Sequence, residues 1–407
     1  MIDKNLFLHD LAVVAILKNE GHYLKEWLDY HLLAGVDHFY LYDNDSTDNQ
    51  AEVAKPYIEA GLVDYISAPG KVMQMPVYND AVKRFKFQSR YIAFIDSDEF
   101  IFPKTGKSIL KTVDEILSCD PKAAALGINW QMFGSNGQDK ADYSQGVLER
   151  FTRRAPTDWT GNTRGNGHVK IISNPRRIYF IHNPHCAIYF DEFYPVNENG
   201  KIIKGHVPNA FNIPVTSEKI VINHYYVKSL EEFERKIRRG RCDQPDNNYS
   251  MYYFKEFNHN EVFDDGILRY RADRAEKFSL ESVEEKFQRV TNALTKILLR
   301  YADEEIFDLE TALTCRAISN YLNLKIYEEA SLAAILKSLN NISAVEANLL
   351  IFDLPNLLRL PYPLVEEIRK AVLEIMPLLI DHAKKETDWQ YFVGFDYLND
   401  LLKSGGI

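Results

Sequence analysis

Residues 91–100, YIAFIDSDEF, combine an apolar run with a dense group of carboxylates. The run at 91–95 is typical of a strand that is buried on both faces of a parallel sheet. Asp96, Asp98 and Glu99 follow it, and three carboxylates so close together would repel one another without a cation. Mg²⁺ or Mn²⁺ would relieve that repulsion, because both ions prefer oxygen ligands. The structural alternative is a solvated acidic turn, so the spacing alone makes a metal site a hypothesis.

The residues before this stretch alternate between expected strands and expected helices. LAVVAIL at 11–17 predicts a second strand that is buried on both faces. Further strands are expected at 36–42 and 62–66, and helices at 20–34, about 50–60 and 72–87. This order predicts an α/β fold, Rossmann-like, with a mostly parallel sheet and flanking helices. Ligands of such sheets bind beyond the carboxyl ends of the strands.

Polar side chains occur at these expected strand ends. Lys18 and Glu20 follow the first strand, and the loop DNDSTD at 43–48 follows the second. The structural role of this loop would be to cap the next helix through a hydroxyl side chain. Its carboxylates, Asp43 and Asp45, could also accept hydrogen bonds from a base or a ribose.

The chain changes character near residue 279, where it becomes rich in Leu, Glu and Ala. Helical periods are expected at 281–301, 307–322, 326–339, 343–351, 363–382 and 388–403. We therefore expect a main domain at 1–250, a linker or extension at 251–278 and an all-helical C-terminal region at 279–407. The apolar faces of these helices need partners, which makes a homo-oligomer one expectation.

The composition excludes several classes of protein. The 407 residues include 24 Tyr, 23 Phe and 4 Trp, enough for a large core, which excludes disorder as the main state. A net charge of −10 argues against general nucleic-acid binding. The sequence contains no run of about 18 apolar residues, so we expect no membrane span. Peripheral association with a membrane stays an expectation. The 4 scattered Cys suit a reducing compartment, so we expect a cytoplasmic protein.

An ordered set of segments resembles glycosyltransferases of the GT-A fold, and most closely the family-2-like and family-92-like branch, once called domain of unknown function 23. The segments are ILKNE, EWLDYHLLAGVDHFYLYDNDSTD, YND, FIDSDEF, LGINWQMFGSNG, VKIISNP, HNPH and NHYYVKSLEEFERKIRRG. The resemblance covers about residues 10–245 and not the helical region.

The resemblance implies a GT-A catalytic domain at 1–250 that uses Mn²⁺ or Mg²⁺. It implies transfer of a sugar, of the hexosyl type and with inversion, from a nucleotide diphosphate sugar. A UDP-sugar is the first expectation for the donor. The acceptor would be a glycan, a lipid-linked glycan or another hydroxyl compound, as in the synthesis of a surface polysaccharide.

The resemblance also assigns roles by position. Asp98 matches the direct metal ligand of the family's Asp-X-Asp motif, and Asp96 matches a contact to ribose or metal. His224, in NHYYVKS, matches the late histidine that completes the metal site in this fold. Glu20 and Asp45 match acidic positions that line the nucleoside pocket. A lone histidine is more often a structural residue, so the role of His224 depends on the resemblance.

Basic residues gather after His224 and have two interpretations. They either neutralise the leaving diphosphate or form a solvated helix face with i,i+4 ion pairs. Lys228 and Arg235 are favoured because they are close to His224 in the sequence, and Lys170 is a further candidate. The expected donor-binding residues are Lys18, Glu20, Asp43, Asp45, Asp96, Lys170, Lys228 and Arg235.

The acceptor side is less defined. Trp130 could stack on the apolar face of a sugar, although a buried Trp is more often part of a core. An inverting transfer needs a base that deprotonates the acceptor hydroxyl. The carboxylates considered for this role are Asp142, Asp158, Asp191 and Glu192, and the last two are taken as candidates.

Three other functions compete with this interpretation. A nucleotidyltransferase would share the acidic metal site, but it usually carries a Gly-rich phosphate loop where this chain has LKNEGHY. A phosphatase would place Asp-X-Asp after the first strand and not after the fourth. A binding module without activity would not need Asp96, Asp98 and His224 together.

Overall fold

The computed structural model describes residues 2–190, 192–203, 211–243, 250–270, 281–303, 308–339 and 342–379. Its N-terminal part alternates strands and helices in the predicted order. The elements are η1 (Lys4–Leu6), β1 (His9–Leu17), α1 (Gly21–Leu33), β2 (His38–Asp43), α2 (Gln50–Glu59), β3 (Val63–Ser67), α3 (Gln74–Phe85) and β4 (Ser89–Phe94). Strands β3, β2, β1 and β4 pair in parallel, as predicted, and the structure places them side by side in that order.

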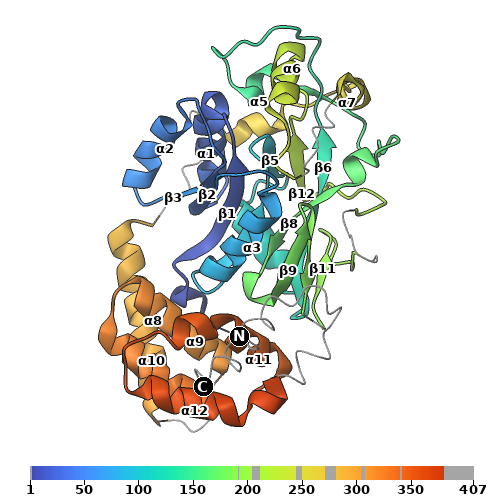
Figure 1. Ribbon diagram of the computed structural model, residues 1–407. Helices are drawn as coiled ribbons and strands as arrows, with labels where there is room; N and C mark the ends of the chain where they lie inside the picture. The colour runs from blue at the N-terminus through green and yellow to red at the C-terminus, as the bar shows by residue number, and fades with distance from the viewer. Residues whose placement is uncertain are drawn as a thin grey trace.

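A mixed half extends the sheet beyond β4 (Figure 1). Its elements are β5 (Glu99–Pro103), α4 (Ile109–Leu117), β6 (Ala123–Met132), α5 (Val147–Arg150), β7 (Arg153–Arg154), η2 (Gly165–Gly167), β8 (Val169–Ser173), η3 (Pro175–Arg177), β9 (Ile178–Asn183), β10 (Cys186–Tyr189), β11 (Tyr194–Val196) and β12 (Ile220–His224). The order is β3-β2-β1-β4-β8-β6-β12-β5, in which only β8 and β5 run against the other strands. The carboxyl ends of β1, β2, β4, β6 and β12 therefore meet at one edge, and the α/β fold class with a mostly parallel sheet is confirmed.

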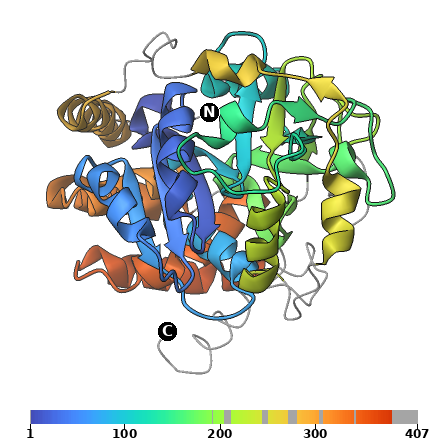
Figure 2. The ribbon, with the colours of Figure 1, turned by 90° about the horizontal axis from the view of Figure 1, so that it is seen from above.

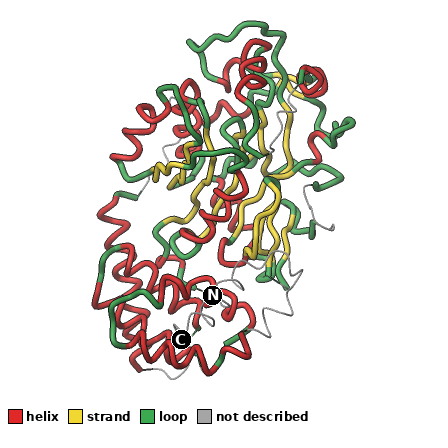
Figure 3. Tube along the Cα trace, viewed as in Figure 1, coloured by secondary structure: helices red, strands yellow, loops and turns green. Residues whose placement is uncertain are grey.

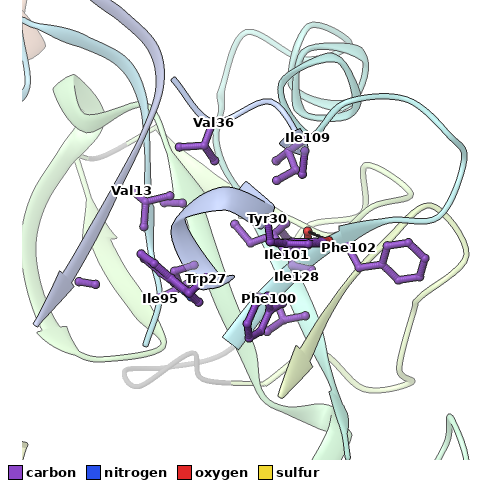
Figure 4. Close-up of a cluster of buried hydrophobic side chains, with 14 of the residues drawn as sticks. Val13, Trp27, Tyr30, Val36, Ile95, Phe100, Ile101, Phe102, Ile109 and Ile128 are labelled. Atoms are coloured by element: carbon purple, nitrogen blue, oxygen red, sulfur yellow. Dashed lines mark hydrogen bonds between the residues drawn. The ribbon is translucent and has the colours of Figure 1, made fainter. Parts of the chain in front are cut away.

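Strand β1 is buried on both faces, as its continuous apolar run predicts. Val13 and its odd-numbered neighbours enter a core with α1, α4 and β5. Val14 and its even-numbered neighbours enter a second core, with α3, on the opposite face. Figure 4 shows the first core, where Trp27 and Tyr30 of α1 lie beside Phe100 and Ile101 of β5.

Side chains of α1 bond to the backbone of the edge strand β5. The indole nitrogen of Trp27 donates to the carbonyl of Glu99 at 2.8 Å, and the hydroxyl of Tyr30 donates to the carbonyl of Ile101 at 2.8 Å. His31 Nε2 accepts the N–H of Ile101 at 3.3 Å. Unpaired backbone groups on an edge strand would otherwise be costly to bury. Helix α1 therefore fixes the strand that begins at the acidic motif.

The residues after β12 pack against the core that contains Val13 and Trp27, which we call the main core. They form α6 (Leu230–Arg239), α7 (Met251–Phe257), β13 (Val262–Phe263) and η4 (Gly266–Tyr270). Helix α6 begins with a capping box of Ser229 and Glu232. Phe257 and Tyr270 belong to the main core, so the described part of the expected linker or extension packs on the α/β domain.

The C-terminal region consists of helices as far as the structure describes it (Figures 1 and 3). The helices are α8 (Val283–Asp303), α9 (Leu309–Tyr321), α10 (Lys325–Ser338), α11 (Ala344–Leu357) and α12 (Leu364–Glu374). The first three lie close to the predicted ranges, whereas α11 continues past its predicted end at residue 351 and α12 ends before the predicted 382. The expected helix at 388–403 lies outside the described residues. Within the described part of the chain, the helices are too short or too polar for a membrane crossing.

The helical region packs against the N-terminal part of the α/β domain. In Figure 2 the orange and red helices lie beneath the blue half of the chain. Leu6 and Leu8 enter a cluster with Val290 and Leu294 of α8. A buried ion pair adds to this contact: Glu310 of α9 accepts from Arg176 Nε at 3.0 Å and also accepts from Arg177 at 2.8 Å.

This ion pair gives a first prediction. Glu310→Ala should lower the free energy of unfolding by about 3–5 kcal/mol, because it leaves the buried guanidinium of Arg176 without a counter-charge. Differential scanning calorimetry measures the loss. Lys55→Ala removes only an exposed pair with Glu59, at 3.8 Å, and should leave the melting temperature unchanged. Equal melting temperatures for Glu310→Ala and wild type would contradict a role of this ion pair in holding the two regions together.

Candidate active site

A cavity of about 350 Å³ lies at the edge where the strand ends meet, and we call it the first cavity. The predicted residues that line it are Lys18, Glu20, Asp96, Asp98, Trp130 and His224. The sequence places these residues on four different strand ends, and the parallel sheet brings them together. Arg239, the last residue of α6, and residues 240–243 after it form another part of the wall.

The pairing of β5 with β12 brings His224 to the acidic motif. In this antiparallel register His224 is opposite Glu99. His224 Nε2 lies 3.3 Å from Asp98 Oδ1. Burial lowers the pKa of His224, although Asp98 opposes the shift, so the imidazole is neutral at pH 7.

Asp98 is buried but ionised. Burial opposes its ionisation, but Lys236 and His224 together hold the pKa of the Asp98 carboxyl well below its usual range. Lys236 Nζ, from α6, donates to Asp98 Oδ2 at 2.7 Å. Each carboxylate oxygen therefore faces a different partner.

Asp98 and His224 suit a divalent cation as two neighbouring ligands. Ligands at adjacent octahedral positions, each about 2.1 Å from the ion, lie about 3 Å apart. The 3.3 Å between Asp98 Oδ1 and His224 Nε2 is close to that spacing. Among the described residues, no three ligating side chains converge on one point. A cation here would need further oxygen ligands from a substrate, as is common for Mg²⁺ on phosphates.

Asp96 lines the same cavity, but its carboxylate is held by other groups. Oδ2 accepts from Lys170 Nζ at 2.9 Å, and Oδ1 accepts from Gln74 at 2.8 Å. Lys170 is fully buried, is 3.4 Å from Glu99 and does not line the cavity. Lys170 was expected to contact the donor, but the structure places it behind the carboxylates, where it positions them.

Glu99 completes the buried charge cluster. Burial raises the pKa of Glu99, while Lys170 opposes the shift. The backbone N–H of Asp96 donates to Glu99 Oε2 at 2.9 Å, which closes the turn between β4 and β5. The sequence marked Glu99 only as one of three clustered acids, and its structural role follows from this turn.

Glu20 is the N-cap residue of α1, and its carboxylate lies close to two cations. It forms an ion pair with Arg239, and Lys228 Nζ lies 4.0 Å from it. Burial opposes its ionisation, but Arg239 and Lys228 together lower the pKa of the Glu20 carboxyl. The carbonyl of Lys18 also accepts from Arg239 at 2.8 Å.

The loop after β2 contributes Asn44 to the first cavity, whereas Asp43 and Asp45 do not line it. Asp43 accepts from the N–H of Ser46 at 3.2 Å, and Asp45 accepts from the N–H of Gly70 at 3.0 Å. Both aspartates therefore shape the loop. The expected hydroxyl cap is also absent: Asn49 is the N-cap residue of α2, and its side chain makes no capping hydrogen bond.

Trp130 lines the first cavity but is largely buried. One face stacks on His168, with ring centroids 4.5 Å apart, and its edge meets His224 at 4.4 Å. His185 also contacts Trp130 and lines the cavity. Trp130 therefore lies on the side of Asp98 and His224, and its contact with an acceptor stays a prediction.

The described base candidates, Asp142, Asp158 and Glu192, line neither the first cavity nor the second cavity that adjoins it. Glu192 pairs with Lys122 at 3.7 Å, beside the amino end of β6, whereas the site is at its carboxyl end. Asp142 and Asp158 are exposed and line neither cavity. Asp191 lies outside the described residues.

A second cavity of about 300 Å³ adjoins the first. Lys228 and Arg235, both expected to contact the donor, line the second cavity and not the first. Lys236 and Arg239 line both cavities. These two residues are three positions apart on α6 and therefore lie on one face of the helix. This i,i+3 spacing is visible in the sequence and could have identified them as site residues.

Comparisons with known proteins point to one family. A model of glycosyltransferase family 92 matches residues 14–291. A family 92 protein of Ricinus communis is 26% identical over 236 residues, which cover 57% of this chain and 38% of that protein. One from Oryza sativa subsp. japonica is 29% identical over 236 residues, covering 56% and 35%. The chain thus spans little more than a third of the length of these relatives.

A galactan beta-1,4-galactosyltransferase of Arabidopsis thaliana is 32% identical over 96 residues, covering 21% of this chain and 18% of that protein. Among solved structures, residues 1–349 of S. aureus TarS in complex with UDP show 16% identity and a TM-score of 0.33. That alignment covers 94% of this chain and 93% of the other. A TM-score of this size assigns neither a ligand nor an activity.

The position of Lys170 gives a second prediction. Lys170→Met should lower the free energy of unfolding by about 3–5 kcal/mol, because Asp96 and Glu99 lose the cation between them. Adding Glu99→Gln should recover part of this loss, since a neutral amide replaces one buried carboxylate. Urea titration measures both changes. Lys122→Met, at an exposed ion pair, is the matched control, and equal midpoints for Lys170→Met and wild type would refute the positioning role.

Proposed function

The chain belongs to glycosyltransferase family 92, and from this premise we propose that it transfers a sugar from a nucleotide diphosphate sugar to a hydroxyl group. The proposal rests on the first cavity, which is lined by Asp98 and His224 together with the cations of α6, Lys236 and Arg239. A UDP-sugar is the proposed donor, and a glycan or a lipid-linked glycan is the proposed acceptor. The relatives that act on galactan favour a hexosyl group.

In this proposal the donor lies along the first cavity. The nucleoside occupies the part near Asn44 and Gln74, and the diphosphate lies at Asp98, Lys236 and Arg239. The transferred sugar then points toward Trp130 and His185. Asp96 is held in place by Lys170 and Gln74, which suits a fixed hydrogen-bond acceptor for the ribose.

We propose that Asp98 and His224 hold Mn²⁺ or Mg²⁺ together with the donor diphosphate. The bound cation would compensate the charge that develops on the leaving diphosphate. Lys236 is close enough to share this task, because its ammonium group already lies 2.7 Å from Asp98. When a cation is bound, the proton of the neutral His224 ring would lie on Nδ1, which faces Glu99 at 3.9 Å, and Nε2 would offer its lone pair to the cation beside Asp98.

An inverting transfer needs a base for the acceptor hydroxyl. Glu20 and Asp98 are the carboxylates that line both cavities, and Asp98 is assigned to the cation. We therefore propose Glu20 as the base in place of Glu192. Synthesis of a surface polysaccharide, contact with a membrane surface and a homo-oligomer through the C-terminal helices stay predictions.

The proposal predicts activity that depends on a metal. Nucleotide sugars incubated with the protein and Mn²⁺ should release nucleotide, and a chelator should stop the release. Asp98→Asn and His224→Gln should each lower the rate at least about 100-fold, because the diphosphate loses its positioned counter-charge. Calorimetric titration with UDP should show that both variants lose the effect of Mn²⁺ on affinity.

Glu192→Gln is the control for these variants, because it changes an exposed ion pair at the other end of β6. It should release nucleotide at the wild-type rate. Full activity in chelator would overturn the metal-dependent proposal. If none of the nucleotide sugars releases nucleotide, the proposed function is overturned.

A further inference from the structure

The second cavity shares a wall with the first. The residues that line both are Glu20, Asp98, Tyr226, Lys236 and Arg239. Its other walls come from the start of α1, the loop after β2, the loop before α5 and the first turns of α6. A transferase must bring two substrates to one reacting centre, and these two cavities meet at Asp98 and Glu20.

We propose that the second cavity binds the acceptor, and that this acceptor is a neutral glycan. The inference rests on the proposed function, in which the first cavity holds the donor. It assigns the acceptor to Tyr143 and His22, and not to Trp130, which lies with the donor-binding residues.

Tyr143 and His22 form an aromatic surface at this cavity. Their rings stack with centroids 3.8 Å apart and an interplanar angle of 9°. Tyr143 is 37% exposed, and its hydroxyl lies 2.5 Å from Arg235, which fixes the ring. Stacking on His22 covers one face of the Tyr143 ring, and the C–H groups of a sugar can contact the other face at little cost in conformational entropy, because the ring is held in one orientation.

The wall next to Tyr143 is polar and is held by hydrogen bonds. Tyr23 and Glu232 line the cavity, and Arg150 behind them donates to the Tyr23 hydroxyl at 2.7 Å and to Glu232 at 3.2 Å. The Tyr23 hydroxyl also donates to Glu232. Sugar hydroxyls need fixed donors and acceptors of this kind, and a preorganised wall loses little freedom on binding.

The charges around the second cavity favour a neutral ligand. Its four cations, Lys228, Arg235, Lys236 and Arg239, are matched by the four carboxylates Glu20, Asp48, Asp98 and Glu232. Lys236 and Arg239 are already paired with Asp98 and Glu20. Arg235 is paired with Glu231 at 2.7 Å. A phosphate-bearing acceptor would therefore meet no excess of positive charge here.

The test measures glycan binding to the protein saturated with UDP and Mn²⁺. The probes are β-1,4-linked tetrasaccharides of galactose, glucose, mannose and N-acetylglucosamine, with sn-glycerol 3-phosphate as the anionic probe. At least one tetrasaccharide should bind in calorimetry, and more tightly than glycerol phosphate. Tyr143→Ala should weaken that binding about tenfold, and Tyr143→Phe, which keeps the ring, should not.

Tyr321→Ala is the matched control, because Tyr321 is similarly exposed but lies on α9. It should bind glycan as the wild type does. The inference is overturned if no tetrasaccharide binds, if Tyr143→Ala binds as tightly as wild type, or if glycerol phosphate binds better. A protein that binds UDP but fails these tests keeps the proposed function, whereas one that binds no UDP loses both.

Discussion

The candidate site depends on the antiparallel register of β5 against β12. This register places His224 opposite Glu99 and therefore next to Asp98. A slip by one residue would turn every side chain of the strand to the other face of the sheet and separate the imidazole from the carboxylate. Helix α1 protects the register, because Trp27 and Tyr30 bond to carbonyl groups on the free edge of β5.

Charge compensation is the second feature that shapes the site. The β4–β5 turn holds three buried or half-buried carboxylates, and two lysines on different sides of the turn compensate their negative charge. Lys170 lies behind Asp96 and Glu99, whereas Lys236 faces Asp98 from α6. The first cation is inaccessible and serves the fold, and the second lines both cavities. A ligand that brings its own negative charge can therefore compete for Lys236 without disturbing the core.

The sequence predicts the parallel half of the sheet well, because an apolar run such as 11–17 is typical of a strand buried on both faces. Strand β1 is buried in this way, with alternate residues in two cores. It predicts individual site residues less well. Asn44, and not the flanking aspartates, reaches the first cavity, since the loop uses Asp43 and Asp45 for its own hydrogen bonds. Proximity in sequence favoured Arg235, but the helical phase of α6 turns Lys236 toward Asp98. Strand β5 and the position of His224 depend on long-range pairing, which no local pattern reveals.

The proposed transfer requires Asp98 and His224 to bind a cation together with a nucleotide diphosphate. Pulsed electron paramagnetic resonance of Mn²⁺ in the presence of the protein and UDP tests it most directly. Coordination by His224 should give hyperfine coupling from one imidazole nitrogen, and His224→Gln should lose that coupling. A wild-type spectrum without nitrogen coupling, or an unchanged spectrum in the variant, would contradict it.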